Sequence, residues 1–356
     1  MSSNFKRSLV NECGRRGERL SEFLFHEGRG KDLFRAHESV VARGCENDES
    51  IGVFTTDDGS IKKNDYIFNL KRGLYEPLSS AISLSNAIAK APDFVRRAKE
   101  VAPGFETHTS MALNFLLESP QYRSSCPLKL SVPLCWTGDQ VALLMGTCAF
   151  DRVKTRRTFM KNAHHAIFGG ENALPFELYA WAISQVLSRA LKTDTFYSFI
   201  PGVDLLNHNH HTKANCEIRL VQGVEGVEVV AVATRDILNQ NEEITISYGN
   251  ELSNDEFLRK YGFCVENNEN DYIDLLSPTG KVSLSKKTDF ADFTKEHIKR
   301  VLEKLAEKRQ ILNEVSFHNT FLSEKEESNS QWINAIKILR KGEIEIIDFV
   351  ENALHL

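Results

Sequence analysis

The strongest constraint on the fold is the period of the hydrophobic residues, which changes along the chain from two to helical and back to two. The stretch ESIGVFTTDDGSIKKNDYIFNL alternates at 51–53 and 66–70, on either side of a turn-rich segment at 57–60. This pattern predicts two paired strands joined by a short loop. The alternation returns between 215 and 248, in CEIRLV, VEVVAVA and EITISY, with a glycine-bounded turn after the first of these. An α+β fold is predicted, in which strands bracket a helical insertion.

The insertion runs from about 80 to 190. Its clearest helix is PFELYAWAISQVLSRAL, where apolar residues recur at helical spacing. Pro175 suits the first turn, because its missing N–H is not needed there. The predicted buried face consists of Phe176, Tyr179, Ala180, Ile183, Val186, Leu187 and Ala190.

Both ends of the chain are also predicted to be helical. Residues 1–48 are polar and compatible with helix, and we interpret them as an appendage. After a charged transition near 280 to 290, the tail is predicted to be helical to the end, with separate helices around Gly342 and a solvated loop at SEKEESNSQ.

Composition narrows the class of protein. The chain has 356 residues, 41% of them hydrophobic, and is long enough to bury a large core. Its formal net charge is -5 with both signs mixed along the sequence, which argues against nucleic acid as a partner. No apolar run approaches the roughly 18 residues that span a bilayer, and the N-terminus has no signal-peptide core. We therefore expect no membrane partner and favour an intracellular, cytoplasmic location, with the nucleus left open.

The seven cysteines are scattered and include no CxxC pair. This spacing argues against a zinc cluster and against a secreted disulfide framework. Reduced, mostly buried thiols are the expected state.

Chemistry-bearing residues concentrate in two neighbouring segments, FIPGVDLLNHNHHTKANCEI and NEEITISYGNELSNDEFLRKYGFC. Taken alone, Asn207 and His208 with His210 and His211 could form a metal cluster. Adjacent residues rarely point to one centre, and no cysteine cluster stands nearby in sequence. We therefore expect no metal and interpret His210 and His211 as surface-loop residues. The Asn-His pair alone is also compatible with a turn that ends a strand.

The order and spacing of the motifs in these segments resemble SET-domain methyltransferases, in the branch of the Rubisco large-subunit methyltransferase and fungal ribosomal-protein methyltransferases. The matching residues are Asp204 with Asn207-His208, Glu242-Glu243 with Tyr248, Ser253-Asn254-x-Glu256, and Tyr261-Gly262-Phe263, with the two tyrosines 13 positions apart. ESIGVF, Ser188-Arg189 and AIKILRKGE resemble further family segments, so the resemblance covers about residues 49 to 350.

The resemblance implies S-adenosyl-L-methionine as cofactor. In the family the backbone of Asn207 and His208 would hold the adenine, and Glu49 and Ile51 would contact the cofactor through the backbone, with Gly52 permitting close approach. It also implies cofactor roles for Ser188, Arg189, Asp204 and Tyr248; the Arg189 guanidinium could pair with the methionine carboxylate. Ordinary alternatives are a hairpin glycine at 52, a solvated arginine at a helix end, and an Asp204 carboxylate that caps backbone groups.

Tyr248 is the leading catalytic candidate. Methyl transfer from a sulfonium is an in-line displacement, so the barrier falls mainly through alignment and exclusion of water, and a tyrosine hydroxyl supplies a rigid, aimed hydrogen-bonding group. Tyr261 and Phe263 would form the aromatic wall of a lysine channel, with Leu191 and Asp204 also on the substrate side. Without the resemblance, these aromatic residues would be read as core packing.

The resemblance implies a SET domain at 49–280, with short twisted sheets, a threaded C-terminal segment and the helical insertion, followed by a small helical substrate-binding lobe at 281–356. It implies a protein-lysine N-methyltransferase. The absence of cysteine-rich zinc modules favours a non-histone substrate, with a ribosomal or translation-associated protein as the expected partner. Two alternatives stay open: methylation of a histidine, and a non-catalytic SET scaffold that binds a protein partner.

Overall fold

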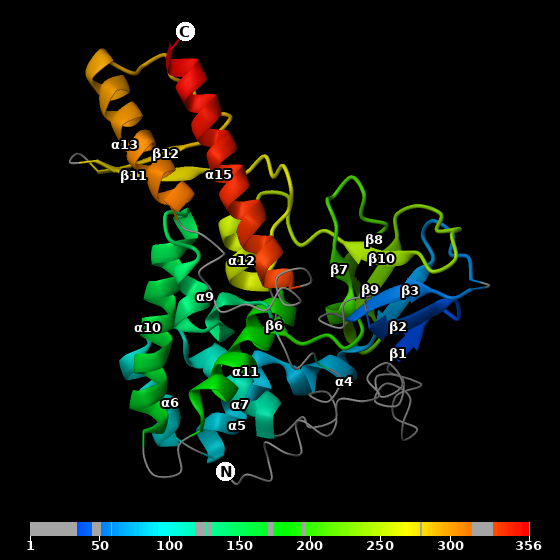
Figure 1. Ribbon diagram of the computed structural model, residues 1–356. Helices are drawn as coiled ribbons and strands as arrows, with labels where there is room; N and C mark the ends of the chain where they lie inside the picture. The colour runs from blue at the N-terminus through cyan, green and yellow to red at the C-terminus, as the bar shows by residue number, and fades with distance from the viewer. Residues whose placement is uncertain are drawn as a thin grey trace. The chain divides into compact units, whose positions relative to one another are not determined.

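The computed structural model describes residues 34–44, 51–57, 59–90, 92–117, 126, 130–169, 174–193, 197–277, 280–314 and 330–355. These residues form two compact units (Figure 1). The first unit contains residues 1–129 and 161–250, and the second contains 130–160 and 251–356. Both strands and helices are present, and the fold is α+β, as predicted.

The helices and strands follow one another along the chain as β1 (Phe34–Ala36), β2 (Val40–Gly44), β3 (Ile51–Thr55), β4 (Tyr66–Leu70), α4 (Arg72–Tyr75), η2 (Glu76–Leu78), α5 (Ser80–Lys90), α6 (Pro92–Val101), α7 (Glu106–Leu117), η3 (Pro133–Cys135), α9 (Gly138–Ala142), α10 (Cys148–Phe168), α11 (Phe176–Arg189), β5 (Leu191–Lys192), β6 (Tyr197–Ser198), η4 (Val203–Leu205), β7 (Asn207–His208), β8 (Cys216–Gly223), β9 (Gly226–Ala233), β10 (Glu243–Ile246), α12 (Asn254–Tyr261), β11 (Ile273–Ser277), β12 (Gly280–Leu284), α13 (Lys295–Glu314) and α15 (Gln331–His355).

The first unit contains two four-stranded sheets, in the orders β1-β4-β9-β8 and β2-β3-β10-β7, and the two-stranded sheet β5-β6. The strands predicted at 51–53 and 66–70 are present as β3 and β4, but their predicted pairing is wrong. β3 pairs with β2 and β10, and β4 pairs with β1 and β9, so the loop between them crosses from one sheet to the other. Both four-stranded sheets contribute buried residues to one apolar core.

The hairpin predicted from the second alternating region is confirmed. β8 and β9 pair antiparallel along their whole length and end in the register Gly223 to Gly226, so the turn consists of two residues. β10 then lies between β3, with which it pairs antiparallel, and the two-residue strand β7, with which it pairs in parallel. This position brings the segment that leads to Tyr248 beside the Asn207–His208 pair.

The helical insertion is also confirmed, as α5, α6, α7, α10 and α11. α11 begins one residue after Pro175, which occupies the N-cap. The prediction of a single buried face is incomplete, because all eight residues from 179 to 186 are buried. Neighbouring structure therefore surrounds this helix on all sides, which hydrophobic spacing alone does not reveal.

The helical prediction for residues 1–48 is wrong over its described part, since 34–36 and 40–44 are strands. Residues 1–33 and 45–48 lie outside the described residues. The contacts also place 251–280 in one unit with the C-terminal helices, a different division from the predicted boundary at 281. That boundary stays a prediction about where the SET domain ends.

The second unit contains the C-terminal helices and the hairpin β11-β12, which the sequence analysis did not predict. α15 is one continuous helix through Gly342, so the predicted separation into helices around this glycine is wrong. The loop predicted at SEKEESNSQ falls almost entirely outside the described residues. α13 and α15 enclose a core with β11 and β12 that includes Leu275, Leu305 and Ile347.

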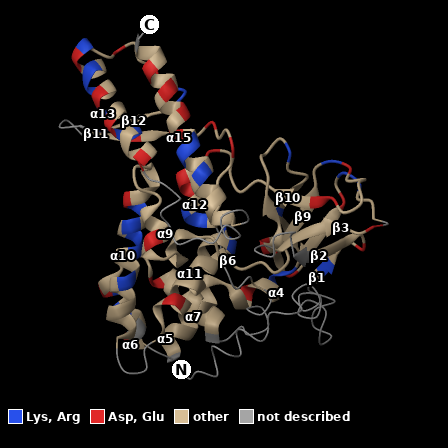
Figure 2. Cartoon of the chain, in the orientation of Figure 1, with Lys and Arg blue, Asp and Glu red and all other residues tan. Residues whose placement is uncertain are grey.

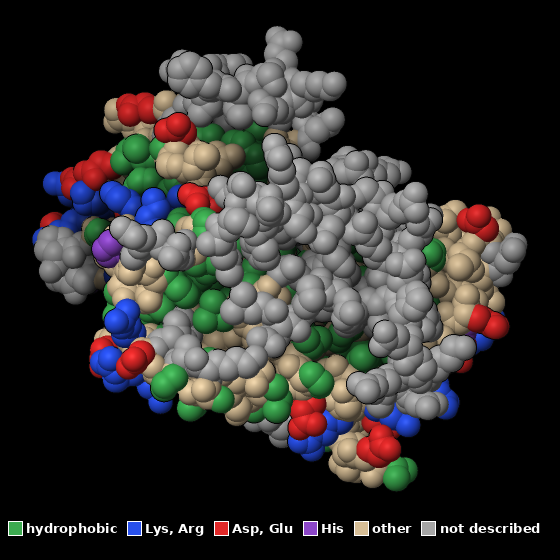
Figure 3. All heavy atoms as spheres, turned by 90° about the horizontal axis from the view of Figure 1, so that it is seen from below, with side chains coloured by type: hydrophobic (Ala, Val, Ile, Leu, Met, Phe, Trp, Pro, Cys, Tyr) green, Lys and Arg blue, Asp and Glu red, His purple; other side chains and the backbone are tan. Residues whose placement is uncertain are grey.

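Charges of both signs alternate on the surface. Lys, Arg, Asp and Glu are interspersed along α13 and α15 (Figure 2). Among the described atoms seen from below, acidic, basic and hydrophobic side chains also lie close to one another (Figure 3). Within the described residues, no helix combines the length and the apolar character that crossing a membrane requires.

Candidate functional site

The Asn207–His208 strand is the centre of a polar cluster in the first unit. Thr245 and Ile246 of β10 pair in parallel with Asn207 and His208. The Asn207 side-chain amide donates to the Glu243 carboxylate at 2.7 Å and to the Ile51 carbonyl at 3.3 Å. Two strands that are far from Asn207 in the sequence, β3 and β10, therefore fix this asparagine.

Gly52 makes room for that contact. A Cβ atom at this position would lie 2.7 Å from the Glu243 carboxylate and 3.1 Å from the Asn207 amide nitrogen. The close approach that the sequence analysis expected at Gly52 is therefore made by side chains of the chain itself. Ile51, just before it, is buried and offers its carbonyl to Asn207. Glu49, the neighbouring candidate, lies outside the described residues.

Tyr248 lies against the same turn. Its backbone N–H donates to His208 Nδ1 at 3.1 Å, its hydroxyl donates to the Leu206 carbonyl at 2.9 Å, and the two rings are 5.3 Å apart. Tyr248 is thus held at its backbone and at its hydroxyl by the segment that carries Asn207 and His208.

His208 must be neutral to accept the Tyr248 N–H, because a protonated imidazole has no acceptor nitrogen. Burial and the neighbouring His210 lower the pKa of His208 to about 4. The ring therefore stays an uncharged acceptor through the physiological range.

We expect acidification to destabilise the first unit through His208. Because its pKa is lower in the folded state than the unperturbed value near 6.5, the unfolded chain binds more protons between these two pH values. Stability is therefore full above about pH 6.5 and falls as pH drops towards 4. Moving from pH 7 to pH 5 should cost about 1 kcal/mol after a discount for partial exposure. Thermal unfolding of the chain and of His208→Asn, which keeps an acceptor near Nδ1, measures the effect; equal pH dependence in both would contradict it.

Arg189 and Asp204 form a buried ion pair beside the turn. The Arg189 Nη2 and Nε atoms lie 3.0 and 3.1 Å from Asp204 Oδ2, and the two side chains are 10% and 1% exposed. Asp204 is the counter-ion of Arg189 within the chain. The carboxylate of a bound cofactor would be a second counter-ion for the same guanidinium. Arg189 is the last residue of α11, and Asp204 lies in η4, three residues before Asn207.

Ser188 and Leu191 flank the same helix end. The Ser188 hydroxyl donates to the Ser184 carbonyl at 2.7 Å, a bond within the helix. Leu191 opens β5, which pairs with β6, and it packs against the core of the two sheets. Their predicted roles towards cofactor and substrate remain predictions.

Tyr261 and Phe263 belong to the second unit, where they form an aromatic cluster with Phe257. Ring centroids are 5.2 Å apart for Phe257 and Phe263, and 6.0 Å apart for Tyr261 and Phe263. Burial raises the pKa of Tyr261, so its hydroxyl stays protonated. Gly262 ends α12 at φ +82°, and a Cβ there would lie 2.4 Å from the Ser131 carbonyl carbon. The glycine of this motif is therefore a packing requirement.

The Ser253-x-x-Glu256 motif is a helix cap. Ser253 accepts the Glu256 backbone N–H, and the Glu256 carboxylate accepts the Ser253 N–H at 3.2 Å. This reciprocal pair is a capping box, and its Ser-x-x-Glu signature can be read from the sequence.

Two residues of the cluster were missed as functional candidates. Glu243 orients Asn207, and Asn215, which is buried, accepts the Thr245 N–H at 2.8 Å and donates to the Glu243 carbonyl at 2.9 Å. Glu243 was visible only as half of an acidic pair in a motif. Nothing in the sequence signals the role of Asn215, because its partners lie about thirty residues away.

His210 and His211 show no metal-binding arrangement. Their rings are 4.2 Å apart, and His210 Nδ1 lies 2.8 Å from the Thr212 hydroxyl. Among the described residues, no group of three or more His, Cys, Asp or Glu side chains could hold a metal ion.

Comparisons with known proteins agree with the motif resemblance. No family model matches the chain. It is 27% identical over 149 residues to SET domain-containing protein 8 and 23% identical over 199 residues to ribosomal lysine N-methyltransferase set10, both from Schizosaccharomyces pombe. These matches cover 39% and 50% of this chain but only 32% and 36% of the relatives, about a third of their length.

Solved structures match over nearly the whole chain. The SET domain of LSMT bound to lysine and AdoHcy superposes with a TM-score of 0.70 at 13% identity, covering 98% of this chain and 92% of that one. Rubisco LSMT bound to AdoMet gives a TM-score of 0.66 at 14% identity, with 96% and 92% coverage. The chain therefore has the fold of the SET-domain methyltransferases.

Proposed function

We propose that this chain is an S-adenosyl-L-methionine-dependent protein-lysine N-methyltransferase that acts on a non-histone protein. The observation that carries the proposal is the convergence of Asn207, His208 and Tyr248 in one hydrogen-bonded cluster on this fold. The solved neighbours of the same fold hold AdoMet, AdoHcy, lysine and methyllysine. The molecules bound in these neighbours support both the cofactor class and the acceptor class.

The residues present fit the proposed cofactor. A zwitterionic amino acid joined to a nucleoside needs paired charges at one end and hydrogen-bonding groups at the other. The first unit offers the Arg189–Asp204 pair and the Asn207–His208 backbone close to one another in sequence and structure, with the buried Ile51 beside Asn207. We propose that Asn207 and His208 hold the adenine and that Arg189, Ser188 and Asp204 hold the amino-acid end.

A bound cofactor would supply an activated methyl group on its sulfonium. The neutral lysine amine would accept that methyl group, with sulfur keeping the electron pair of the broken S–C bond and the surplus ammonium proton leaving to water. Tyr248 contributes a rigid phenol, held by its bonds to Leu206 and His208, that fixes the geometry of the approach. No strong base is needed, because burial beside a cation lowers the pKa of the acceptor amine.

A ribosomal or translation-associated protein is the substrate class we propose. The supporting observation is the similarity to a relative named as a ribosomal lysine N-methyltransferase, at 23% identity over half of this chain.

Two measurements on the purified chain test the proposal. Calorimetry should show binding of S-adenosyl-L-methionine, and incubation with that cofactor and ribosomal proteins should place methyl groups on lysine, detected by mass spectrometry. A folded chain that does not bind the cofactor would point to the non-catalytic scaffold. A methyl group found on histidine would overturn the lysine assignment.

A further inference from the structure

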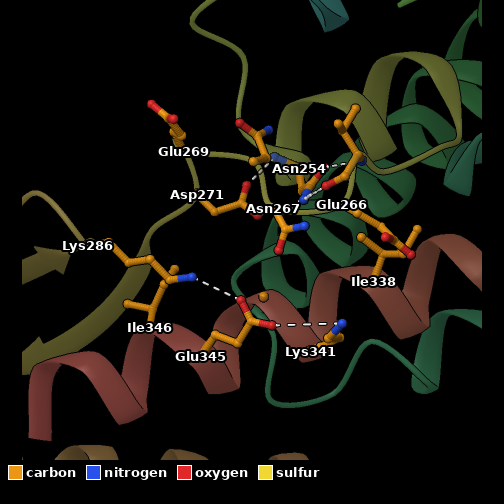
Figure 4. Close-up of a pocket in the computed structure, with 13 residues that line it drawn as sticks. Asn254, Glu266, Asn267, Glu269, Asp271, Lys286, Ile338, Lys341, Glu345 and Ile346 are labelled. Carbon is orange, nitrogen blue, oxygen red and sulfur yellow. Dashed lines mark hydrogen bonds and ion pairs between the residues drawn. The ribbon is translucent and has the colours of Figure 1, made fainter. Parts of the chain in front are cut away.

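A cavity in the second unit lies between the loop 265–271 and α15 (Figure 4). The empty space at this partly open site amounts to about 450 Å³, some of which is open solvent. Its charged and amide lining residues are Asn254, Glu266, Asn267, Asn268, Glu269, Asp271, Lys286, Lys341 and Glu345. The cavity thus lies outside the Asn207–Tyr248 cluster, and nothing in the proposed methyl transfer uses it.

The walls carry more negative than positive charge. Four carboxylates, those of Glu266, Glu269, Asp271 and Glu345, face two lysines. Both lysines are directed at the same carboxylate, with the Nζ atoms of Lys286 and Lys341 2.9 and 4.0 Å from Glu345 (Figure 4). Among the described residues Glu269 pairs with Lys287 alone, and both of these side chains are largely exposed. The wall therefore retains an excess of carboxylates.

Asp271 is the buried one of these carboxylates, at 9% exposure. Both of its oxygens accept hydrogen bonds from Asn254, one from the backbone N–H and one from the side-chain amide, each at 2.6 Å. It forms no ion pair within the described residues, and neither does Glu266. Burial raises the pKa of Asp271 to about 6, although the hydrogen bonds from Asn254 and the charge of Lys286 act in the opposite direction.

Apolar side chains complete the wall. Val265 and Ile338 line the cavity beside the carboxylates, and both are half-buried. An apolar wall with carboxylates suits a side chain that has a methylene stem and a cationic head, which describes arginine and lysine. A bare divalent cation fits less well, because in the described part of the chain no three or more His, Cys, Asp or Glu side chains are grouped so that they could hold a metal ion.

We propose that this cavity is a recognition site for a basic side chain, arginine above all, of the protein substrate, at a position away from the methylated lysine. The proposal rests on the proposed function for the identity of the partner. The planar guanidinium can engage Glu266 and Asp271 together, while Val265 and Ile338 contact its stem. A substrate of this kind is a basic protein segment.

Binding of short peptides to the full chain tests the site without requiring turnover. The probes are fluorescein-labelled peptides that each contain one lysine. They come in pairs that differ at a single flanking position, where one peptide has arginine and its twin has glutamine, and each pair tests a different flanking position. Fluorescence anisotropy should show that at least one arginine peptide binds more tightly than its glutamine twin. Glu266→Lys should weaken that peptide roughly tenfold, and Glu266→Gln by a smaller factor, because charge reversal replaces attraction by repulsion. The glutamine twin should be unaffected.

Glu303→Lys is the matched control. Glu303 is an exposed glutamate on α13 without an ion pair in the described structure, so its reversal makes the same change in net charge. It should change the affinity less than twofold. The proposal is overturned if no arginine peptide binds better than its twin, or if Glu266→Lys and Glu303→Lys weaken binding equally. Calorimetry with S-adenosyl-L-methionine on the same variants separates the recognition site from the proposed function. Both variants should bind the cofactor as the unchanged chain does. Absence of cofactor binding in all of them would count against the proposed function and not against the recognition site.

Discussion

Replacing Tyr248 by Phe is expected to slow methyl transfer by about 10² to 10³-fold, the usual loss when one aimed hydrogen-bonding group is removed from a reacting centre. Phe keeps the ring beside His208 and keeps the backbone N–H that donates to His208 Nδ1. Only the hydroxyl and its bond to the Leu206 carbonyl are lost. Affinity for S-adenosyl-L-methionine should therefore remain within a few-fold. Single-turnover methylation and calorimetry measure the two quantities separately.

Tyr66→Phe is the control for this substitution. Tyr66 is a strand tyrosine of the same unit, 53% exposed, and makes no contact with the Asn207 cluster among its described interactions. The Tyr66→Phe variant should transfer methyl groups at the same rate as the unchanged chain. If Tyr248→Phe transfers methyl groups at the full rate, Tyr248 has no catalytic role.

Replacing Glu343 by Ala should lower the stability of the second unit by about 3 to 5 kcal/mol, the cost of removing one partner from a buried ion pair. The Glu343 side chain is 2% exposed, accepts the Cys148 N–H at the start of α10 at 2.7 Å, and lies 2.7 Å from Lys308 Nζ. Its loss leaves Lys308, itself only 11% exposed, without this counter-ion. Urea unfolding followed by the fluorescence of Trp136 and Trp332, which pack together in this unit, measures the change.

An exposed ion pair on α13, the helix that carries Lys308, provides the comparison. Lys304 and Glu307 lie 2.6 Å apart with side chains 45% and 62% exposed, so Glu307→Ala should cost less than about 0.5 kcal/mol. A loss for Glu343→Ala as small as this would mean that Glu343 is not needed to hold α15 to the start of α10.

Much of the candidate site was readable from the sequence because its parts are local motifs. Asn207 and His208 are adjacent, Tyr248 ends an alternating strand, and Ser253 with Glu256 has the spacing of a helix cap. The parts that could not be read depend on partners far along the chain. Asn207 is oriented by Glu243 and Ile51, and Arg189 has Asp204 as its counter-ion. Sequence spacing contains no information about such contacts unless a family pattern supplies it.

The sequence by itself determined the strands at 51–53, at 66–70 and between 215 and 248, and the helix after Pro175, because hydrophobic period is a local property of each element. It did not identify β1, β2, β11 and β12 as strands. Only the tertiary structure decided which strands pair. Alternation at 51–53 and 66–70 specifies a buried face for each of these strands. Their pairing partners lie more than a hundred residues later in the chain, β10 for β3 and β9 for β4. The same holds for α15, which continues through Gly342 because packing against α13 and the hairpin β11-β12 outweighs the local cost of a glycine in a helix.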